Sequence, residues 1–258
     1  MVSNRVSVGL DSLILWVYVS CRSMVRFDKA CRRADAAVSY FRQHLRVGDY
    51  LSEEGKVEME WFGEGARRLG LSGACGMEAL ERLCAGQHPS TGEKLGVRNK
   101  GTARRVCFFG QISAPKDVSI ALFVGGDRRI QKWWKEAVAE TMREMEAVTA
   151  TRVRAGGRNE DRETGNMVAA YVTHDTSRAL DPQLHTHVCV LNVTFDPVEK
   201  RWKGVQPYGF MRHQGFLREV CYNRLAARMQ EGGYELERQS AIGFTIKGFP
   251  AELREKFS

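Results

Sequence analysis

The 258-residue chain is poor in several residue types and patterns, and each shortage excludes a class of protein. It has only six prolines and no low-complexity tract, which excludes a proline-rich or disordered chain. Its seven cysteines are odd in number and never form a Cys-x-x-Cys motif, which favours reduced thiols in a cytoplasmic setting over a disulfide framework. The apolar run at residues 13–19 is too short to cross a bilayer, so we expect no membrane insertion.

Acidic residues are also scarce relative to basic ones. Asp and Glu total 31 against 39 Lys and Arg, which gives a formal net charge of +8. A basic chain favours a polyanionic partner, nucleic acid first, although the same charge can simply solubilise a surface. We expect residues 24–258 to form one domain. Residues 1–23 differ in character from the rest, and we interpret them as an extension, with Met24 as an alternative start.

Histidine is rare too, yet three of the six histidines lie close together in the sequence. His185 and His187 open the apolar run 188–195, which has the composition of a strand. Residues two apart on a strand face the same way, so both imidazoles should share one face. His174 ends a second strand-like run, residues 167–173, and an antiparallel pairing would bring it beside the other two.

Three convergent imidazoles without a fourth protein ligand describe a catalytic metal site with open positions. The alternative is an ordinary set of surface or hydrogen-bonded histidines. Asp181, in the connecting loop, is a candidate to orient one imidazole through its second nitrogen. On a basic protein such a site favours phosphodiester chemistry, and a tyrosine is then an attractive nucleophile. We single out Tyr40, which lies in a predicted amphipathic helix at residues 28–47.

The other elements complete an α+β pattern. Residues 105–112 read as a buried strand, and Ser113 and Pro115 are expected to cap and begin the helix that follows. Residues 152–158 read as a basic connector. Further helices are expected at 76–85, 127–151 and 210–232, and a strand pair at 234–237 and 243–247. We predict an antiparallel β-sheet with helices packed on it.

Five ordered motifs together resemble the MobF-type conjugative relaxases, the TrwC/TraI class. The histidine segment Asp181-Pro-Gln-Leu-His-Thr-His-Val, preceded by His174-Asp-Thr-Ser-Arg, is similar to the signature of that family. The other matching stretches are Ser39-Tyr40-Phe41 with Asp49-Tyr50, Trp61-Phe-Gly-Glu-Gly-Ala-Arg-Arg-Leu-Gly-Leu71, Ile112-Ser-Ala-Pro-Lys-Asp-Val-Ser119 and Glu163-Thr-Gly-Asn166. They extend over about residues 36–250.

The resemblance implies the HUH endonuclease fold and nicking of one DNA strand at an origin of transfer. It implies Tyr40 as the first nucleophile, linked to the DNA 5′ end, and Tyr50 as a second tyrosine for later strand transfer. His174, His185 and His187 match the metal ligands. The expected ion is Mg²⁺ or Mn²⁺ in cells, while an all-imidazole site would also bind Zn²⁺, Ni²⁺ or Cu²⁺.

The chain departs from the family pattern in two ways. Phe41 and Leu51 follow the tyrosines where the family has paired tyrosines. Phe109, four residues before Ser113, stands where the family carries an aspartate. Gln111 is the nearest polar residue on that strand face. It can orient a histidine but cannot act as a base, so Asp117 or a metal-bound water would take the tyrosine proton.

Recognition of single-stranded or hairpin DNA is expected to be partly electrostatic. Lys116, at a predicted helix N-terminus, suits a phosphate. The other DNA-binding candidates are Arg104, Arg105, Arg152, Arg154 and Arg178. The resemblance further implies accessory relaxosome proteins, a coupling protein, a monomeric relaxase in the bacterial cytoplasm, and a C-terminal clamp and helicase after residue 258.

Three alternatives stay open. A rolling-circle initiator or transposase shares this chemistry, but its tyrosine usually follows the histidine pair. An origin-binding module with impaired cleavage is suggested by Phe109 and the missing second tyrosines. A hydrolase of small phosphodiesters would use the same metal with water and would form no covalent DNA adduct.

Overall fold

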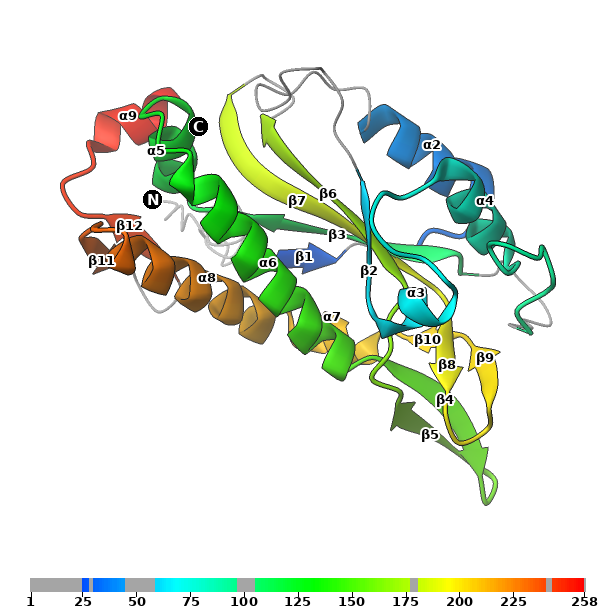
Figure 1. Cartoon of the computed structure of the whole chain (residues 1–258). Coiled ribbons are helices and arrows are strands. Elements are labelled where there is room, and N and C mark those ends of the chain that lie inside the picture. Colours follow the sequence, from blue (N-terminus) through cyan, green and yellow to red (C-terminus); the bar gives the residue numbers. More distant parts are fainter. Residues whose placement is uncertain are drawn as a thin grey trace, which may run out of the picture.

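The computed structural model describes residues 25–27, 30–44, 59–96, 105–176, 181–239 and 243–257 (Figure 1). The extension at 1–23 and the candidates Tyr50, Arg104 and Arg178 lie outside the described residues. In the part of the chain that is described, no helix is both long and apolar enough to cross a membrane.

A five-stranded sheet forms the centre of the fold, and all of its strand pairs are antiparallel. This confirms the predicted α+β class. The strands lie in the order β1 (Val25–Phe27), β3 (Cys107–Ser113), β7 (Pro182–Leu191), β6 (Ala169–Thr176) and β2 (Glu60–Phe62).

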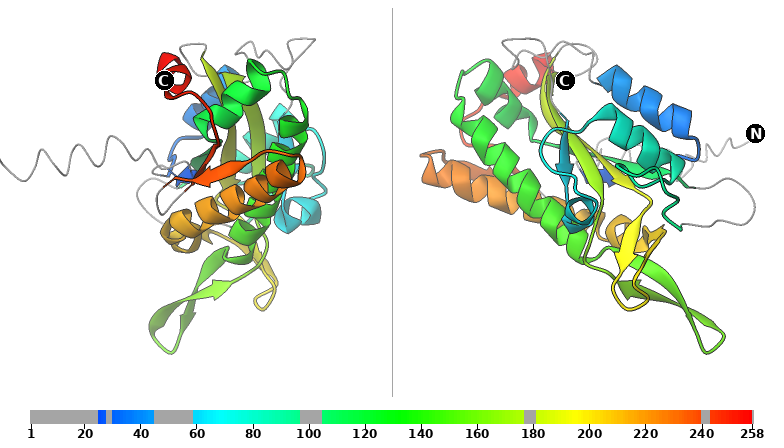
Figure 2. Two further views of the ribbon diagram at one scale, coloured as in Figure 1. Left: turned by 90° about the vertical axis from the view of Figure 1, so that its left-hand side faces the viewer. Right: turned by 45° about the vertical axis from the view of Figure 1, so that its right-hand side comes forward.

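Helices cover both faces of this sheet (Figures 1 and 2). On one face, α5 (Lys116–Phe123), α6 (Arg129–Ala147) and α8 (Gln214–Glu231) pack against the larger hydrophobic core. On the other face, α2 (Ala34–His44) and α4 (Met77–Ala85) enclose a second core. Strand β7 separates the two cores because its residues alternate between the faces. Leu184, Val188 and Val190 join the first core, and Cys189 and Leu191 join the second.

Several details of the predicted secondary structure are wrong. The first helical turn after β3 is not capped by Ser113, since α5 begins at Lys116 with Pro115 as its cap residue and no side-chain cap bond. The Ser113 hydroxyl instead accepts a hydrogen bond from Nε2 of Gln111.

The basic connector predicted at residues 152–158 is a β-ribbon. Strands β4 (Ala150–Ala155) and β5 (Arg158–Glu163) pair in register across Gly156 and Gly157, both with positive φ. Two adjacent residues with positive φ favour a tight hairpin turn, which glycine adopts without steric cost. The ribbon projects from the body of the molecule (Figure 2).

The remaining elements are short and lie around this frame. They are α3 (Glu64–Arg68), β8 (Thr194–Asp196), β9 (Arg201–Lys203), β10 (Val205–Gln206), α7 (Tyr208–Arg212), β11 (Leu236–Arg238), β12 (Phe244–Ile246) and α9 (Ala251–Lys256). The helix predicted at 210–232 is therefore two helices that meet at His213.

Candidate active site

The three histidines meet on the α2 side of the central sheet. His174 of β6 lies directly opposite His185 of β7, and His187 follows two residues along the same strand face. The ring centroids lie 5.4 Å apart for His174 and His185, 5.3 Å for His174 and His187, and 4.8 Å for His185 and His187. His174 is 3% exposed and His185 is 7% exposed, so the cluster lies under the surface. The predicted convergence is confirmed.

Tyr40 reaches this cluster from α2. Its hydroxyl lies 3.0 Å from Nδ1 of His187. Helix α2 is anchored by Ala37 and Phe41, which are 0% and 2% exposed and belong to the second core. Tyr40 itself is half-buried. The helix therefore brings a nucleophile to the histidines across 147 residues of sequence.

A chain of hydrogen bonds defines the imidazole tautomers. Nδ1 of His185 lies 2.8 Å from the carbonyl oxygen of Gln183, which can only accept, so Nδ1 carries the proton. Nε2 of His185 is then an acceptor for Nε2 of His187, 3.1 Å away. His187 consequently presents an unprotonated Nδ1 that accepts the hydroxyl hydrogen of Tyr40. The backbone carbonyl of Gln183 thus determines which atom donates in each hydrogen bond from His185 to Tyr40.

The chemistry of the three imidazoles suits a metal ion. In the described part of the chain, however, no group of three or more His, Cys, Asp or Glu side chains is placed so that it could hold one. The Nε2 atoms of His185 and His187 nevertheless face each other, and imidazole nitrogen is the most common side-chain ligand for transition metals.

The other predicted site residues lie at different distances from this chemistry. Gln111 is directly opposite His187 across the β3–β7 pair, but its amide donates to Ser113. Asp117 is 1% exposed, and its carboxylate accepts from the backbone amides of Val118 and Ile246. Burial raises the pKa of Asp117 against the lowering effect of those amides. The structure therefore commits Asp117 to holding β12, and it does not bring that carboxylate to Tyr40.

Lys116 and Asp181 lie near each other at one end of the site. The Lys116 ammonium group donates to the carbonyl oxygen of Pro182 at 3.4 Å. Burial lowers the pKa of Lys116, and the charge of Asp181 partly opposes this effect. Asp181 was expected to orient one of the imidazoles, and for His185 the partner at Nδ1 is the Gln183 carbonyl.

Sequence and structure comparisons place this geometry in one family. The family model "TrwC relaxase" matches residues 34–258. The chain belongs to the TrwC relaxase family. It is 35% identical over 223 residues to the multifunctional conjugation protein TraI of Escherichia coli, a match that covers 80% of this chain and 12% of that relative. The chain thus spans about an eighth of the length of this relative.

Solved structures agree with this assignment. The conjugative relaxase TrwC in complex with oriT DNA, in a metal-bound structure, matches with a TM-score of 0.79 and 30% identity, over 91% of this chain and 79% of that one. TrwC complexed with a 27-mer DNA comprising the recognition hairpin and the cleavage site matches with a TM-score of 0.77 and 28% identity, over 91% and 78% of the two chains.

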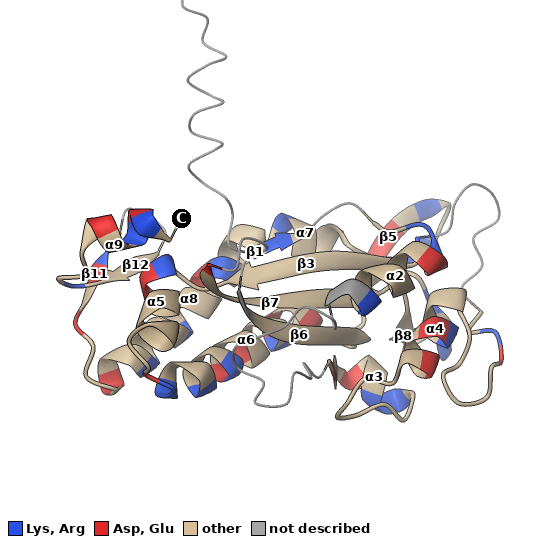
Figure 3. Ribbon diagram, turned by 90° about the horizontal axis from the view of Figure 1, so that it is seen from above, with Lys and Arg blue, Asp and Glu red and all other residues tan. Residues whose placement is uncertain are grey.

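Basic residues of this TrwC-family chain gather where the ribbon leaves the body. Burial lowers the pKa of Arg105, and so do the positive charges of Arg152 and Arg32. Arg152 and Arg154 are exposed and project from the same face of β4. Strands β3 and β7 contain no Lys, Arg, Asp or Glu (Figure 3).

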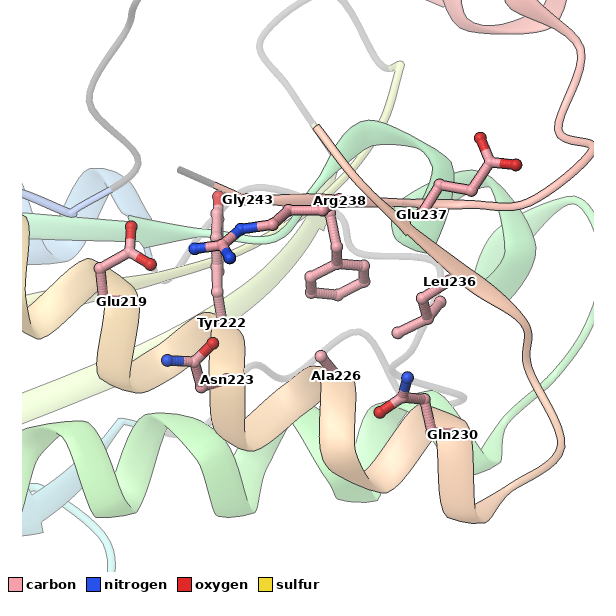
Figure 4. A pocket seen from close by; sticks show the side chains of 10 residues that line it. Glu219, Tyr222, Asn223, Ala226, Gln230, Leu236, Glu237, Arg238 and Gly243 are labelled. Atoms are coloured by element: carbon pink, nitrogen blue, oxygen red, sulfur yellow. The ribbon is translucent and has the colours of Figure 1, made fainter. Parts of the chain in front are cut away.

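A separate groove of about 310 Å³ lies between α8 and the β11–β12 hairpin (Figure 4). Tyr222, Asn223 and Arg238 are among the residues that line it. None of the histidines of the site, nor Tyr40, lines this groove. It therefore stays apart from the chemistry described above.

Sequence reasoning missed the stacking of Tyr40 on Phe109. Their ring centroids lie 4.0 Å apart at an interplanar angle of 35°. In the sequence, Phe109 was noted only because it stands where the family carries an aspartate. Its position two residues before Gln111 could have indicated the contact. Residues two apart on a strand share a face, and Gln111 lies opposite His187.

Proposed function

We propose that the chain is a relaxase domain that nicks one DNA strand at an origin of transfer and stays linked to the cut 5′ end through Tyr40. One observation carries this proposal: the hydroxyl of half-buried Tyr40 lies 3.0 Å from an imidazole of a three-histidine cluster. Family membership and the likeness to TrwC bound to oriT DNA support it.

In the proposed step, Oη of Tyr40 attacks the phosphorus of the scissile phosphodiester. A bond forms between Oη and phosphorus, and the bond between phosphorus and the 3′ oxygen breaks. The phenolic proton leaves to water, and the departing 3′ oxygen gains one proton, so the protons balance. Because one ester replaces another, the phosphotyrosine retains the bond energy needed for rejoining.

His174, His185 and His187 would hold a divalent metal ion, which would neutralise charge on the phosphate oxygens. We propose Mg²⁺ or Mn²⁺ in cells, although imidazole ligands favour Zn²⁺, Ni²⁺ or Cu²⁺ on softness. Nδ1 of His187 lies 3.0 Å from Oη of Tyr40, so this ring would hold the attacking oxygen in place beside the histidine cluster.

The ribbon β4–β5 is the element best suited to duplex DNA. A two-stranded ribbon fits the major groove, and Arg152 and Arg154 lie on one exposed face of it. We propose that the ribbon contacts a DNA hairpin, as the hairpin in the DNA bound to TrwC suggests, and that Lys116 and Arg105 contact phosphates. Tyr50, Arg104 and Arg178 keep their proposed roles in strand transfer and DNA binding.

In the cell, we propose that the domain acts as a monomer in the bacterial cytoplasm. Its partners would be accessory relaxosome proteins and a coupling protein, in keeping with the conjugation role of the TraI relative.

The test is an adduct assay with labelled single-stranded oligonucleotides from candidate origins of transfer, with Mn²⁺ and with chelator. We expect a covalent adduct that resists denaturation, disappears with chelator, and maps to Tyr40 by mass spectrometry. Tyr40→Phe should form no adduct and should still bind hairpin DNA. An adduct that persists in Tyr40→Phe would contradict the assignment of the nucleophile.

A second candidate is an origin-binding module with impaired cleavage. It is favoured by Phe109, which cannot accept a proton, and by the commitment of Asp117 to backbone amides. Tight hairpin binding without an adduct in the unmodified protein would select this candidate. Metal-dependent turnover of small phosphodiesters without an adduct would instead indicate a hydrolase.

A further inference from the structure

We propose that Phe109 is a positioning residue that holds the phenol ring of Tyr40 so that its hydroxyl meets His187. The inference rests on the proposed function, because it concerns how the nucleophile is oriented.

Two contacts, one at the hydroxyl and one at the ring, fix the Tyr40 side chain. Its oxygen meets Nδ1 of His187 at 3.0 Å, and its ring face lies on Phe109 with centroids 4.0 Å apart and planes 35° apart. A hydrogen bond at one atom leaves the ring free to swing about that atom. A second contact on the ring face removes this freedom, so the two together define one orientation of the nucleophile.

Both contacts come from neighbouring strands of the same sheet. Phe109 lies opposite Cys189 in the β3–β7 pair, and Cys189 follows His187 by two residues. Phe109 and His187 are therefore diagonal neighbours on one sheet face, a separation that an aromatic ring spans. The sheet register sets the distance between the two contacts.

Phe109 is itself held in place. Its ring meets the ring of Phe41 at 5.6 Å and 60°, an edge-to-face contact, and Phe41 is 2% exposed in the second core. Phe109 thus lies between helix α2 and the sheet, in contact with two successive residues of the helix. Orientation of a nucleophile before attack contributes to rate through the reaction geometry, without any proton transfer by the ring.

The rate of adduct formation at saturating DNA should depend on this ring. Phe109→Leu keeps an apolar side chain and removes the stacking surface. We expect it to slow single-turnover adduct formation about three- to tenfold, which matches the strength of an aromatic pair. The DNA concentration at half-saturation should stay unchanged, because Phe109 orients the nucleophile and does not bind DNA. Phe109→Tyr keeps an aromatic ring at this position and should form the adduct at the wild-type rate.

Phe62→Leu is the matched control. Phe62 is half-buried on β2 at the far edge of the same sheet and makes an edge contact with Tyr171. It should change thermal stability as Phe109→Leu does and leave the adduct rate at the wild-type value.

NMR spectroscopy can test the contact between the Tyr40 and Phe109 rings without any DNA cleavage. In NMR spectra of protein labelled in its tyrosine rings, the Tyr40 ring signals, assigned with Tyr40→Phe, should be shifted upfield by the ring of Phe109. The shift should disappear in Phe109→Leu and remain in Phe109→Tyr.

Three results would overturn the proposal: no upfield shift in the wild type, a wild-type rate in Phe109→Leu, or an equal loss of rate in Phe62→Leu. If the wild type forms no adduct at Tyr40, the proposed function fails and this inference with it. A normal wild-type adduct that is insensitive to Phe109→Leu overturns this inference alone.

Discussion

At the scale of single residues, Gly63 shows how closely the layers of the fold approach each other. It joins β2 to α3 at φ +105°, and a Cβ there would lie 2.1 Å from the carbonyl oxygen of Met167 and 2.9 Å from Oε1 of Glu146. That Glu146 oxygen accepts the amides of Glu64 at 2.6 Å and Met167 at 2.8 Å. The glycine is therefore required both for its backbone angle and for the space it leaves.

Gly63→Ala should destabilise the fold by about 3 kcal/mol or more, because backbone strain and a backbone clash act together. Urea unfolding measures the change. Gly73→Ala is the control: Gly73 also has a positive φ, +64°, but a Cβ there would have no neighbour within 4 Å. It should cost only about 1 kcal/mol. Equal losses in the two variants would show that close approach to Met167 is unimportant.

Residue-scale sequence reasoning succeeded where the chemistry follows a local period. The two-residue repeat on a strand was enough to predict that His185 and His187 share a face. It could not predict that Tyr40 stacks on Phe109, because the docking of α2 on the sheet depends on packing between distant segments. Nor could it predict that a backbone carbonyl, that of Gln183, would orient His185, since carbonyls leave no mark in a sequence.

At the scale of elements, the β4–β5 ribbon was mistaken for a connector. Its charged residues and its two glycines are typical of a loop. Because the ribbon projects from the body, most of its length has no buried face, and its sequence therefore lacks the alternation of apolar and polar residues that indicates a strand. Thr151 and Val153 are buried on one face of β4 and give the alternation typical of a strand, but they are too few to predict it. The central sheet was predictable because its strands are buried and apolar.

Arg152→Ala combined with Arg154→Ala should weaken binding to hairpin DNA and reduce the slope of log K against log salt by about 2, since about one counterion is released for each phosphate contact. Titrations at several salt concentrations measure the slope. Arg143→Ala, on the exposed side of α6, should leave it unchanged. A parallel loss in both proteins would mean that overall charge, and not the ribbon, governs binding.

The β8–β9 hairpin should govern part of the acid sensitivity of the fold. Burial pushes the pKa of Asp196 upward, but the amides of Glu199 and Val198 together with Arg162 and Lys203 outweigh it and hold the pKa at about 2. A lowered pKa in the folded state stabilises the protein above the ordinary pKa near about 4. That stabilisation is lost as the pH falls towards 2.

Wild-type protein should therefore lose about 2 kcal/mol more than Asp196→Asn between pH 4 and pH 2, as measured by urea unfolding at a series of pH values. Asp35→Asn is the comparison, because the pKa of Asp35 is also about 2 while its side chain is exposed beside Arg33. An exposed ion pair contributes little to stability, so this variant should follow the wild type. Similar pH profiles for wild type and Asp196→Asn would contradict the role given to the hairpin.

At the scale of the whole molecule, the site joins parts that are distant in sequence. The histidines belong to β6 and β7, the nucleophile to α2, and the ring beneath it to β3, so the site exists only when the second core is formed. The unfolded chain cannot present the three imidazoles together. A metal ion that binds them should therefore bind the folded state selectively and raise its stability by mass action.

Metal at about 100 times its dissociation constant should add about 2.7 kcal/mol, equivalent to a rise of roughly 5–10 °C in Tm for a domain of this size. Thermal unfolding with Mn²⁺ or Ni²⁺, and again after chelator, measures this shift. His185→Ala should abolish it, because that variant removes a ligand whose tautomer is already set. His213→Ala, at the exposed junction of α7 and α8, should retain it. An equal shift in all three proteins would place the metal elsewhere in the molecule and remove the histidine cluster from the chemistry of Tyr40.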